Sequence, residues 1–179
     1  MRTFIQIDVQ NLFFSAKDIK KRINFLKIKE YFQKSGDKIV GLYAYIIRTP
    51  DANSVKFERF LLSLGYNLII KEAIKTTNRE GRNIYRGTDQ DTAITIDCMR
   101  KIKQFDKWVL MSGDGDFIDL CKYLKKEDKA IDVWALKGSS FNKKFCDYVD
   151  SIHFFNNNFL YDHKERGQGP VSVVKKDII

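Results

Sequence analysis

Four aspartates stand where strand-like segments end or helix-like segments begin, and carboxylates gathered in this way can hold a divalent metal. They are Asp8, Asp91, Asp114 and Asp116. Carboxylates that are distant in sequence meet in an open parallel sheet, because its ligand crevice lies outside the carboxyl ends of the strands. Four such charges repel each other unless a cation lies among them, and oxygen-only ligands suit Mg²⁺ or Mn²⁺. The pattern predicts a metal-dependent site that cleaves phosphodiester bonds.

The segment from Ser112 to Phe117, which reads SGDGDF, is the most specific of these motifs. Its glycines let the backbone bend sharply and leave space for a phosphate or a metal. We expect Asp114 at the end of a strand and Asp116 at the start of a helix. The competing interpretation is a glycine-rich turn with Asp116 as a helix cap, which does not account for two acids so close together.

Asp8 follows Ile5 and Ile7 and precedes Asn11. At a strand-to-loop junction, Asp8 can point into the crevice, and Asn11 can offer a neutral oxygen or a donor. The alternative is that Asp8 caps the next helix, a role that aspartate and asparagine fill well. The sequence leaves both interpretations open.

Asp89 and Asp91 open a helix-like segment that continues through Ile94 and beyond. An acid in a first turn is electrostatically favourable without any function. Asp97 lies six residues after Asp91, which places it roughly 120° around a helix, so the two cannot both point straight at one metal. We choose Asp91 as the ligand, with Asp97 in reserve and Asp89 as the alternative if the helix starts earlier.

The elements that must position these residues alternate between strand and helix patterns, which is typical of a parallel sheet with helices on both faces. Strands are predicted at 3–9, 38–48, 66–70, 107–111, 130–136 and 151–155. Helices are predicted at 12–34 (as one or two), from the turn at 49–51 to Gly65, and at 88–103, 114–127 and 140–148. Residues 71–87 predict a mobile loop or a short hairpin over the site. One domain over 1–160 and a polar, flexible tail over 161–179 complete the organisation.

The charge balance indicates a polyanionic partner. Lys and Arg number 32 against 23 acids, a net charge of +9, which favours nucleic acid first and an anionic membrane surface second. No apolar run approaches the ~20 residues that span a bilayer. Three cysteines without a CxxC pair, each in an apolar stretch, predict buried, reduced thiols and a cytoplasmic protein. Neither a P-loop nor a zinc-binding histidine pattern is present.

These motifs together resemble the NYN domain, in the LabA-like branch of the PIN-like nuclease superfamily, over about residues 1–156. The matching pieces are Ile7-Asp8-Val9-Gln10-Asn11, Arg86-Gly87 through Asp91 to Asp97, and Ser112 to Phe117, and 141–150 resembles the family's ending. The chain departs from the family's pattern in three ways: Arg86 replaces the usual lysine, Val9 replaces a common glycine, and one extra residue lies between Gly87 and Asp91.

The resemblance implies a three-layer α/β/α fold with a central, mainly parallel sheet, and a metal-dependent ribonuclease. It implies that Asp8, Asp91, Asp114 and Asp116 form the acidic, metal-binding site, with Asn11 and Ser112 beside it. We expect RNA, single-stranded or structured, as the substrate. Contacts to the RNA are expected from Ser112, from Arg82 and Arg86 of the basic segment 71–87, and from Lys143. The basic side chains among them would bind the phosphate backbone of the RNA without reading its sequence.

Two other classes of function stay open. One is a non-catalytic RNA-binding or scaffold module on the same fold, in which at least one acid should be misplaced. The other is a different Mg²⁺ enzyme, such as a Toprim-like domain or a haloacid-dehalogenase-like phosphatase. The Toprim pattern lacks its strand-end glutamate here, since Asp8 stands in that place, and Asp8-Val9-Gln10 lacks the phosphatase's paired aspartates. A homodimer is a partner that the sequence neither favours nor excludes.

Overall fold

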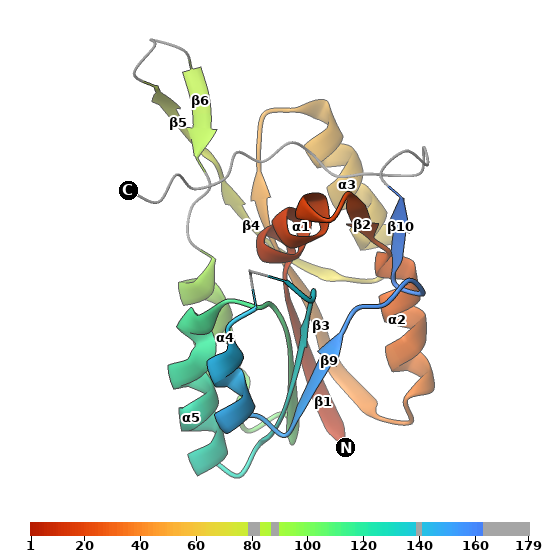
Figure 1. Cartoon of the computed structure of the whole chain (residues 1–179), viewed down its shortest axis with the longest axis vertical. Helices are drawn as coiled ribbons and strands as arrows, with labels where there is room; N and C mark the ends of the chain where they lie inside the picture. The colour runs from red at the N-terminus through yellow and green to blue at the C-terminus, as the bar shows by residue number, and fades with distance from the viewer. Residues whose placement is uncertain (79–82, 87–89, 139–140, 163–179) are drawn as a thin grey trace.

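A six-stranded parallel sheet forms the centre of the molecule (Figure 1). The computed structural model describes residues 1–78, 83–86, 90–138 and 141–162. The strand order is β4-β3-β1-β7-β8-β9. The strands are β1 (Arg2–Asp8), β3 (Lys38–Arg48), β4 (Asn67–Glu72), β7 (Lys107–Met111), β8 (Ala130–Ala135) and β9 (Ser151–Phe154). The predicted parallel sheet is confirmed.

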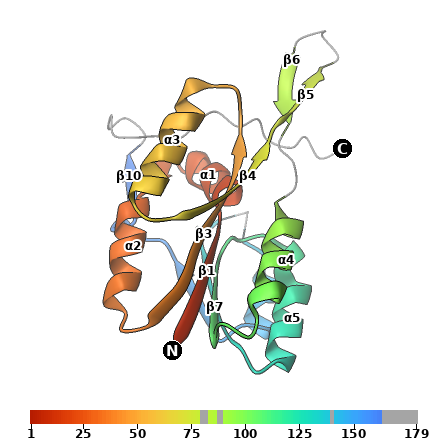
Figure 2. The same ribbon diagram turned by 180° about the vertical axis from the view of Figure 1, so that it is seen from behind.

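Helices cover both faces of this sheet, as Figures 1 and 2 show from opposite sides. On one face lie α1 (Val9–Asp18), α2 (Phe25–Lys34) and α3 (Ala52–Ser63), and on the other α4 (Asp91–Lys101) and α5 (Ile118–Lys126). Successive residues of a strand point to opposite faces. Ile5 and Ile7 therefore enter the core beneath α1–α3, and Phe4 enters the core beneath α4 and α5. The three-layer α/β/α architecture is the one expected.

Several boundaries differ from the sequence-based expectation. Of the one or two helices expected over 12–34 there are two, and the first begins earlier, at Val9; they are separated because Lys20 adopts a left-handed backbone (φ 57°) and the short strand β2 (Lys21–Ile23) follows it. That strand pairs antiparallel with β10 (Leu160–Asp162). The helix expected at 140–148 is shorter and of the 3₁₀ type: η2 spans Lys143–Asp147, and residue 140 lies outside the described residues. A 3₁₀ turn, η1 (Gly115–Phe117), precedes α5, and α4 begins at Asp91, after residues 87–89, which are not described.

The basic segment between β4 and α4 contains a hairpin, which is one of the two structures expected there. Strands β5 (Ile74–Thr77) and β6 (Asn83–Arg86) pair antiparallel, with Lys75 opposite Tyr85. Both views show the hairpin standing away from the three-layer body (Figures 1 and 2). Its position in the chain puts it directly before the helix that carries Asp91.

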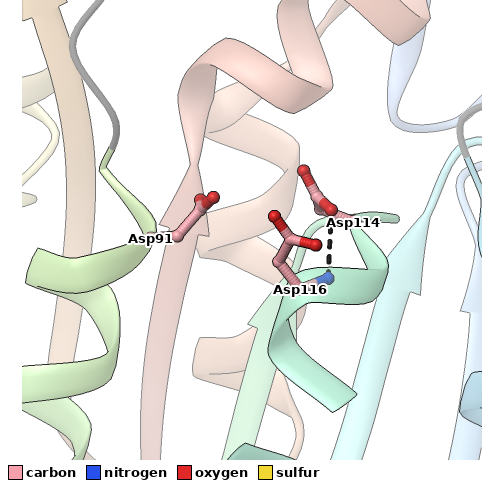
Figure 3. A group of neighbouring side chains, drawn as sticks. All are labelled: Asp91, Asp114 and Asp116. Carbon is pink, nitrogen blue, oxygen red and sulfur yellow. Dashed lines mark hydrogen bonds between the residues drawn. The ribbon is translucent and has the colours of Figure 1, made fainter. Parts of the chain in front are cut away.

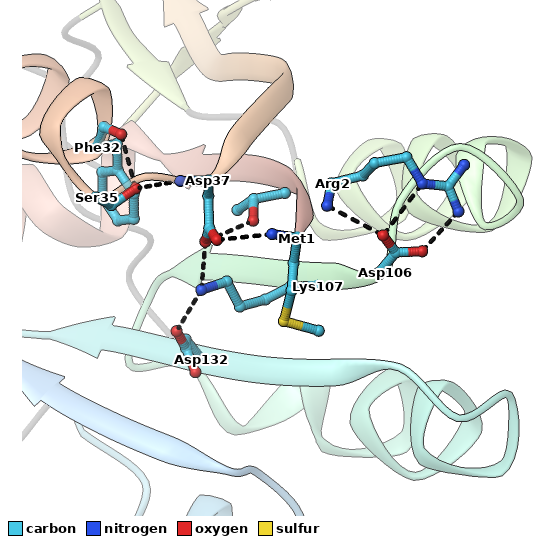
Figure 4. Close-up of polar contacts among 9 residues, drawn as sticks. Met1, Arg2, Phe32, Ser35, Asp37, Asp106, Lys107 and Asp132 are labelled. Carbon is cyan, nitrogen blue, oxygen red and sulfur yellow. Dashed lines mark hydrogen bonds and ion pairs between the residues drawn. The ribbon is translucent and has the colours of Figure 1, made fainter.

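Ion pairs join the opposite, amino-terminal ends of the strands (Figure 4). Lys107 Nζ lies 2.5 Å from Asp37 Oδ2 and 3.7 Å from Asp132 Oδ2, and Arg2 pairs with Asp106 at 2.6 Å. The hydrogen bond from Lys107 is the main reason that the pKa of Asp37 is lowered to about 2. These contacts tie β1, β7 and β8 together at the end of the sheet remote from the aspartates.

The cysteines and the hydropathy of the helices can be compared with the sequence-based expectations. Cys98 and Cys121 are buried and unpaired, as expected, whereas Cys146 on η2 is exposed, contrary to expectation, because η2 is a surface turn and not a packed α-helix. Within the described part of the chain, no helix combines the length and the apolar character that crossing a membrane requires.

Candidate metal centre

The predicted acidic residues lie at the point where the order of strands changes direction. From β1 the chain proceeds outward through β3 and β4, and then returns to the other side of β1 to lay down β7, β8 and β9. In open α/β sheets, ligands bind in the crevice at such a switch point, outside the carboxyl ends of the strands. Asp8 ends β1 and Ser112 directly follows β7, so both stand at this crevice.

Three of the four predicted aspartates converge there. One carboxylate oxygen of each of Asp91, Asp114 and Asp116 lies within 4.8 Å of the others. Figure 3 shows Asp91 reaching from the start of α4 toward Asp114 and Asp116, which belong to the turn before α5. Asp91 and Asp114 are half-buried and Asp116 is exposed, so the group opens to solvent on one side.

The SGDGDF turn is held by its own polar groups. The Asp114 carboxylate accepts a hydrogen bond from the Asp116 backbone N–H at 3.1 Å and so caps η1 (Figure 3). The Ser112 hydroxyl accepts from the Asp114 N–H at 3.2 Å. One carboxylate oxygen of Asp114 thus orders the turn. The turn in its place holds Asp116 beside Asp114.

Asp8 is not among the three aspartates that converge within 4.8 Å of one another. Its side chain is buried and caps α1: Oδ1 accepts from the Asn11 N–H at 2.9 Å, and Oδ2 accepts from the Ser112 hydroxyl at 3.2 Å. Burial raises the pKa of Asp8 to about 6, with a smaller contribution from the negative charge of Asp114. In this structure Asp8 therefore acts as the cap of α1. Direct binding of a metal by Asp8 stays a prediction.

Asn11 supports the turn from the opposite side. Its Oδ1 accepts a hydrogen bond from the Gly113 N–H at 3.0 Å. Ser112, which is fully buried, bridges Asp8 and the Asp114 N–H. In this structure both residues hold the backbone that carries the aspartates. Ser112 was expected to contact substrate; it is fully buried here and makes these supporting contacts, and a contact to substrate stays a prediction.

Sequence reasoning missed Asn142. Its backbone N–H donates to the Gly113 carbonyl at 3.0 Å, and its side chain caps η2 by accepting from the Lys144 N–H at 3.0 Å. A methyl group on Gly115 would lie 2.1 Å from Asn142 Nδ2, so any larger residue there requires the Asn142 side chain to move. An asparagine is a favoured cap before a helical turn, and that preference is the signal by which it could have been found.

The remaining site predictions lie farther out or outside the described residues. Lys143 is exposed on η2. Arg82, Asp89 and the side chain of Arg86 are outside the described residues. Asp97, the reserve ligand, instead accepts a hydrogen bond from the Tyr45 hydroxyl at 3.0 Å.

The chemistry of the three converging aspartates fits Mg²⁺ or Mn²⁺. All the donor atoms are carboxylate oxygens, which these hard cations prefer. Three like charges so close to each other are mutually repulsive, and a divalent cation relieves that repulsion. Because Asp116 is exposed, a cation held by these carboxylates would be reachable from solvent.

Comparison with known proteins bears on the family and on the fold. The model of the NYN domain matches residues 2–157. The "Low amplitude and bright protein LabA" of Synechococcus elongatus is 28% identical over 141 residues, which cover 76% of this chain and 75% of that protein. A crystal structure of VPA0982 from Vibrio parahaemolyticus, a protein of unknown function, superposes with a TM-score of 0.77 at 24% identity, over 89% of this chain and 96% of that one, and supports the fold. The chain therefore belongs to the NYN-domain family, within the PIN-like nuclease superfamily.

Proposed function

We propose that the protein is a metal-dependent endoribonuclease. The observation that carries the proposal is the convergence of Asp91, Asp114 and Asp116 within 4.8 Å at the switch point of a nuclease-superfamily fold. Bound Mg²⁺ or Mn²⁺ would lower the pKa of a water molecule and stabilise negative charge on the phosphate. The three carboxylates would hold the cation, and Asp8, Asn11 and Ser112 would keep the SGDGDF turn in place beneath them.

RNA contacts are proposed on both sides of these aspartates. On the side of Asp91, the hairpin presents Lys75, which is exposed, opposite Tyr85, which is half-buried. The Lys75 ammonium group suits a phosphate of the RNA, and the Tyr85 ring suits the face of an unstacked base. On the side of Asp116, η2 presents the exposed Lys143 and Lys144. A strand of RNA passing over the aspartates would meet positive charge before and after the scissile bond.

The alternative proposal is an RNA-binding module without catalysis. The observation in its favour is that Asp8, expected among the ligands, has both carboxylate oxygens engaged by Asn11 and Ser112. It predicts RNA binding that is indifferent to divalent metal. The convergence of the other three aspartates favours the nuclease.

A cleavage assay separates the two. Labelled single-stranded RNA of mixed sequence is incubated with the wild type, Asp114→Asn and Asp119→Asn, in Mn²⁺, Mg²⁺ or EDTA. Asp119 is a suitable control because it lies on α5 with a side chain that is 91% exposed and outside the converging group. We expect metal-dependent cutting by the wild type and Asp119→Asn, and at least roughly 100-fold slower cutting by Asp114→Asn, since removal of a ligand should cost no less than removal of an outer partner.

RNA binding by Asp114→Asn should persist, because the basic surface is unchanged. Cutting that survives both EDTA and the loss of Asp114 would reject the nuclease. Intact RNA with every metal, combined with tight binding by all three proteins, would favour the binding module.

A further inference from the structure

A chain of hydrogen bonds, buried except at its part-buried Asp97 end, joins the sheet to α4. Gln6 Nε2 donates to the Tyr45 hydroxyl at 2.5 Å and to the Ile94 carbonyl at 3.0 Å, and Gln6 Oε1 accepts from Trp108 Nε1 at 2.7 Å. The Tyr45 hydroxyl in turn donates to Asp97 Oδ2 at 3.0 Å. Gln6, Tyr45 and Trp108 are fully buried. The chain of bonds therefore connects β7, β1 and β3 to the helix that carries Asp91.

The direction of each bond in this chain is fixed. Both N–H groups of the Gln6 amide are used as donors and its oxygen is used as an acceptor, which is nearly its full capacity. Tyr45 accepts from Gln6 and has one proton to give, which goes to Asp97. Burial raises the pKa of the Tyr45 hydroxyl, which keeps that proton in place. Asp97 is the last acceptor in this series of hydrogen bonds. One of its two carboxylate oxygens therefore has a hydrogen-bond partner within the protein and needs no metal to satisfy it.

A second contact ties down the start of the same helix. Gln90, which is 3% exposed, donates from Nε2 to the Ile46 carbonyl of β3 at 2.7 Å. Asp91 is the next residue in the chain, and Asp97 lies about 9 Å farther along the helix axis. The first two turns of α4 are thus attached to the sheet on both sides of Asp91. Gln90 bonds to β3 just before it, and the Ile94 carbonyl and Asp97 bond to β1 and β3 after it.

We propose that Asp97 is a positioning residue for Asp91, acting with Tyr45 and Gln6 through the backbone of α4. The inference rests on the proposed metal site. Apolar packing against the sheet limits how far a helix can move away, whereas hydrogen bonds have preferred distances and angles and so also restrict rotation and sliding. Fixing α4 in this way keeps the Asp91 carboxylate opposite Asp114 and Asp116, which belong to a separate segment of the chain.

The test measures Mn²⁺ affinity by isothermal titration calorimetry on the full chain, with circular dichroism to show that each variant is folded. Asp97→Leu removes the acceptor. Asp97→Asn keeps an acceptor oxygen but removes the charge. Cys98→Ala is the matched control, because Cys98 is the adjacent buried residue of α4 and its truncation loosens packing without touching the hydrogen bonds. Tyr45→Phe, which removes only the hydroxyl, replaces Asp97→Leu if the latter does not fold.

We expect Asp97→Leu or Tyr45→Phe to weaken Mn²⁺ binding by at least ~10-fold, the range found when outer partners of a metal site are removed. Asp97→Asn and Cys98→Ala should bind like the wild type. Unchanged affinity in Asp97→Leu would overturn the inference, as would an equal loss in Cys98→Ala, which would assign the effect to stability. An equal loss in Asp97→Asn would also overturn it, because charge rather than position would then matter.

These outcomes are separable from those of the proposed function. If the wild type binds Mn²⁺ and the variants behave as expected while no RNA is cut, the positioning role is supported and the nuclease is rejected. If the wild type does not bind Mn²⁺, the metal centre and the inference built on it are both rejected. Normal cleavage by the wild type together with unchanged affinity in every variant rejects the positioning role alone.

Discussion

The Ser112 hydroxyl donates a hydrogen bond to the buried carboxylate of Asp8 across 3.2 Å and accepts another from the Asp114 N–H at the same distance. Asp8 closes β1 and Asp114 follows β7, so one serine joins the ends of two adjacent strands. The turn that carries Asp114 is therefore linked through Ser112 to Asp8, a buried acid whose charged form is destabilised by burial.

Asp8→Asn should stabilise the metal-free protein at pH 6 and above. The pKa of Asp8 is about 6 in the folded state, above its ordinary value of 3.8, so the folded state disfavours the charged form. The contribution of protonated Asp8 to the free energy of unfolding is therefore fully present below pH 3.8 and is lost as the pH rises to 6. The difference between these two limits is about 3 kcal/mol. Urea unfolding in EDTA should show Asp8→Asn gaining about 1–3 kcal/mol over the wild type between pH 4 and pH 8.

Asn at position 8 can still accept from the Asn11 N–H and can donate to Ser112, so the comparison isolates the charge. Adding Mn²⁺ should narrow the difference, because a nearby cation favours the charged carboxylate. A constant difference between the two proteins across this range of pH would contradict the assignment.

Ser112→Ala should destabilise the fold and weaken the metal centre together. The substitution leaves the Asp114 N–H and one oxygen of Asp8 without their partner, at a cost of about 1–3 kcal/mol in the free energy of unfolding. Ser63→Ala is the control, since its hydroxyl donates only to the Phe60 carbonyl at the exposed end of α3 and should matter by less than about 0.5 kcal/mol. Equal effects from both serines would count against the bridge.

Gly115→Ala should disturb the turn through Asn142. The new methyl group would lie 2.1 Å from Asn142 Nδ2 and 2.9 Å from its Cγ, so Asn142 must move and release the Lys144 N–H that it caps. We expect a loss of about 1–3 kcal/mol, the usual cost of overpacking. A double-mutant cycle with Asn142→Ala measures the clash directly: the double variant should lose less than the sum of the single variants, and simple additivity would place the strain elsewhere.

Lys75→Ala should weaken RNA binding and reduce its salt dependence, with no effect on Mn²⁺ affinity. Removing one cation that neutralises a phosphate lowers the slope of log affinity against log salt by about 1. Lys38→Ala is the control, because Lys38 is exposed at the amino-terminal end of β3, remote from the aspartates. Filter binding of a single-stranded RNA at several salt concentrations provides the slopes, and indistinguishable slopes for Lys75→Ala and Lys38→Ala would remove the hairpin from the RNA surface.

Much of this arrangement follows from local sequence. Runs such as KIVGLYAYIIR are apolar enough to identify a strand buried on both faces, and parallel strands bring their carboxyl ends together, so the meeting of Asp91 with Asp114 could be anticipated. What could not be anticipated depends on contacts between remote segments. The pairing of β2 with β10 joins residues more than a hundred positions apart, and whether Asp8 faces inward or toward a metal depends on where Ser112 comes to lie.

The place of the hairpin in the chain has a consequence for changes in its length. It lies in the crossover that leaves the edge strand β4 and returns through α4 to the middle of the sheet at β7. Residues added to or removed from its tip change the register of none of the six strands, and they leave the first turn of α4 where Gln90 attaches it to β3. A longer, shorter or differently composed hairpin at this place would therefore change the surface beside the three aspartates while leaving the proposed metal site itself as it is.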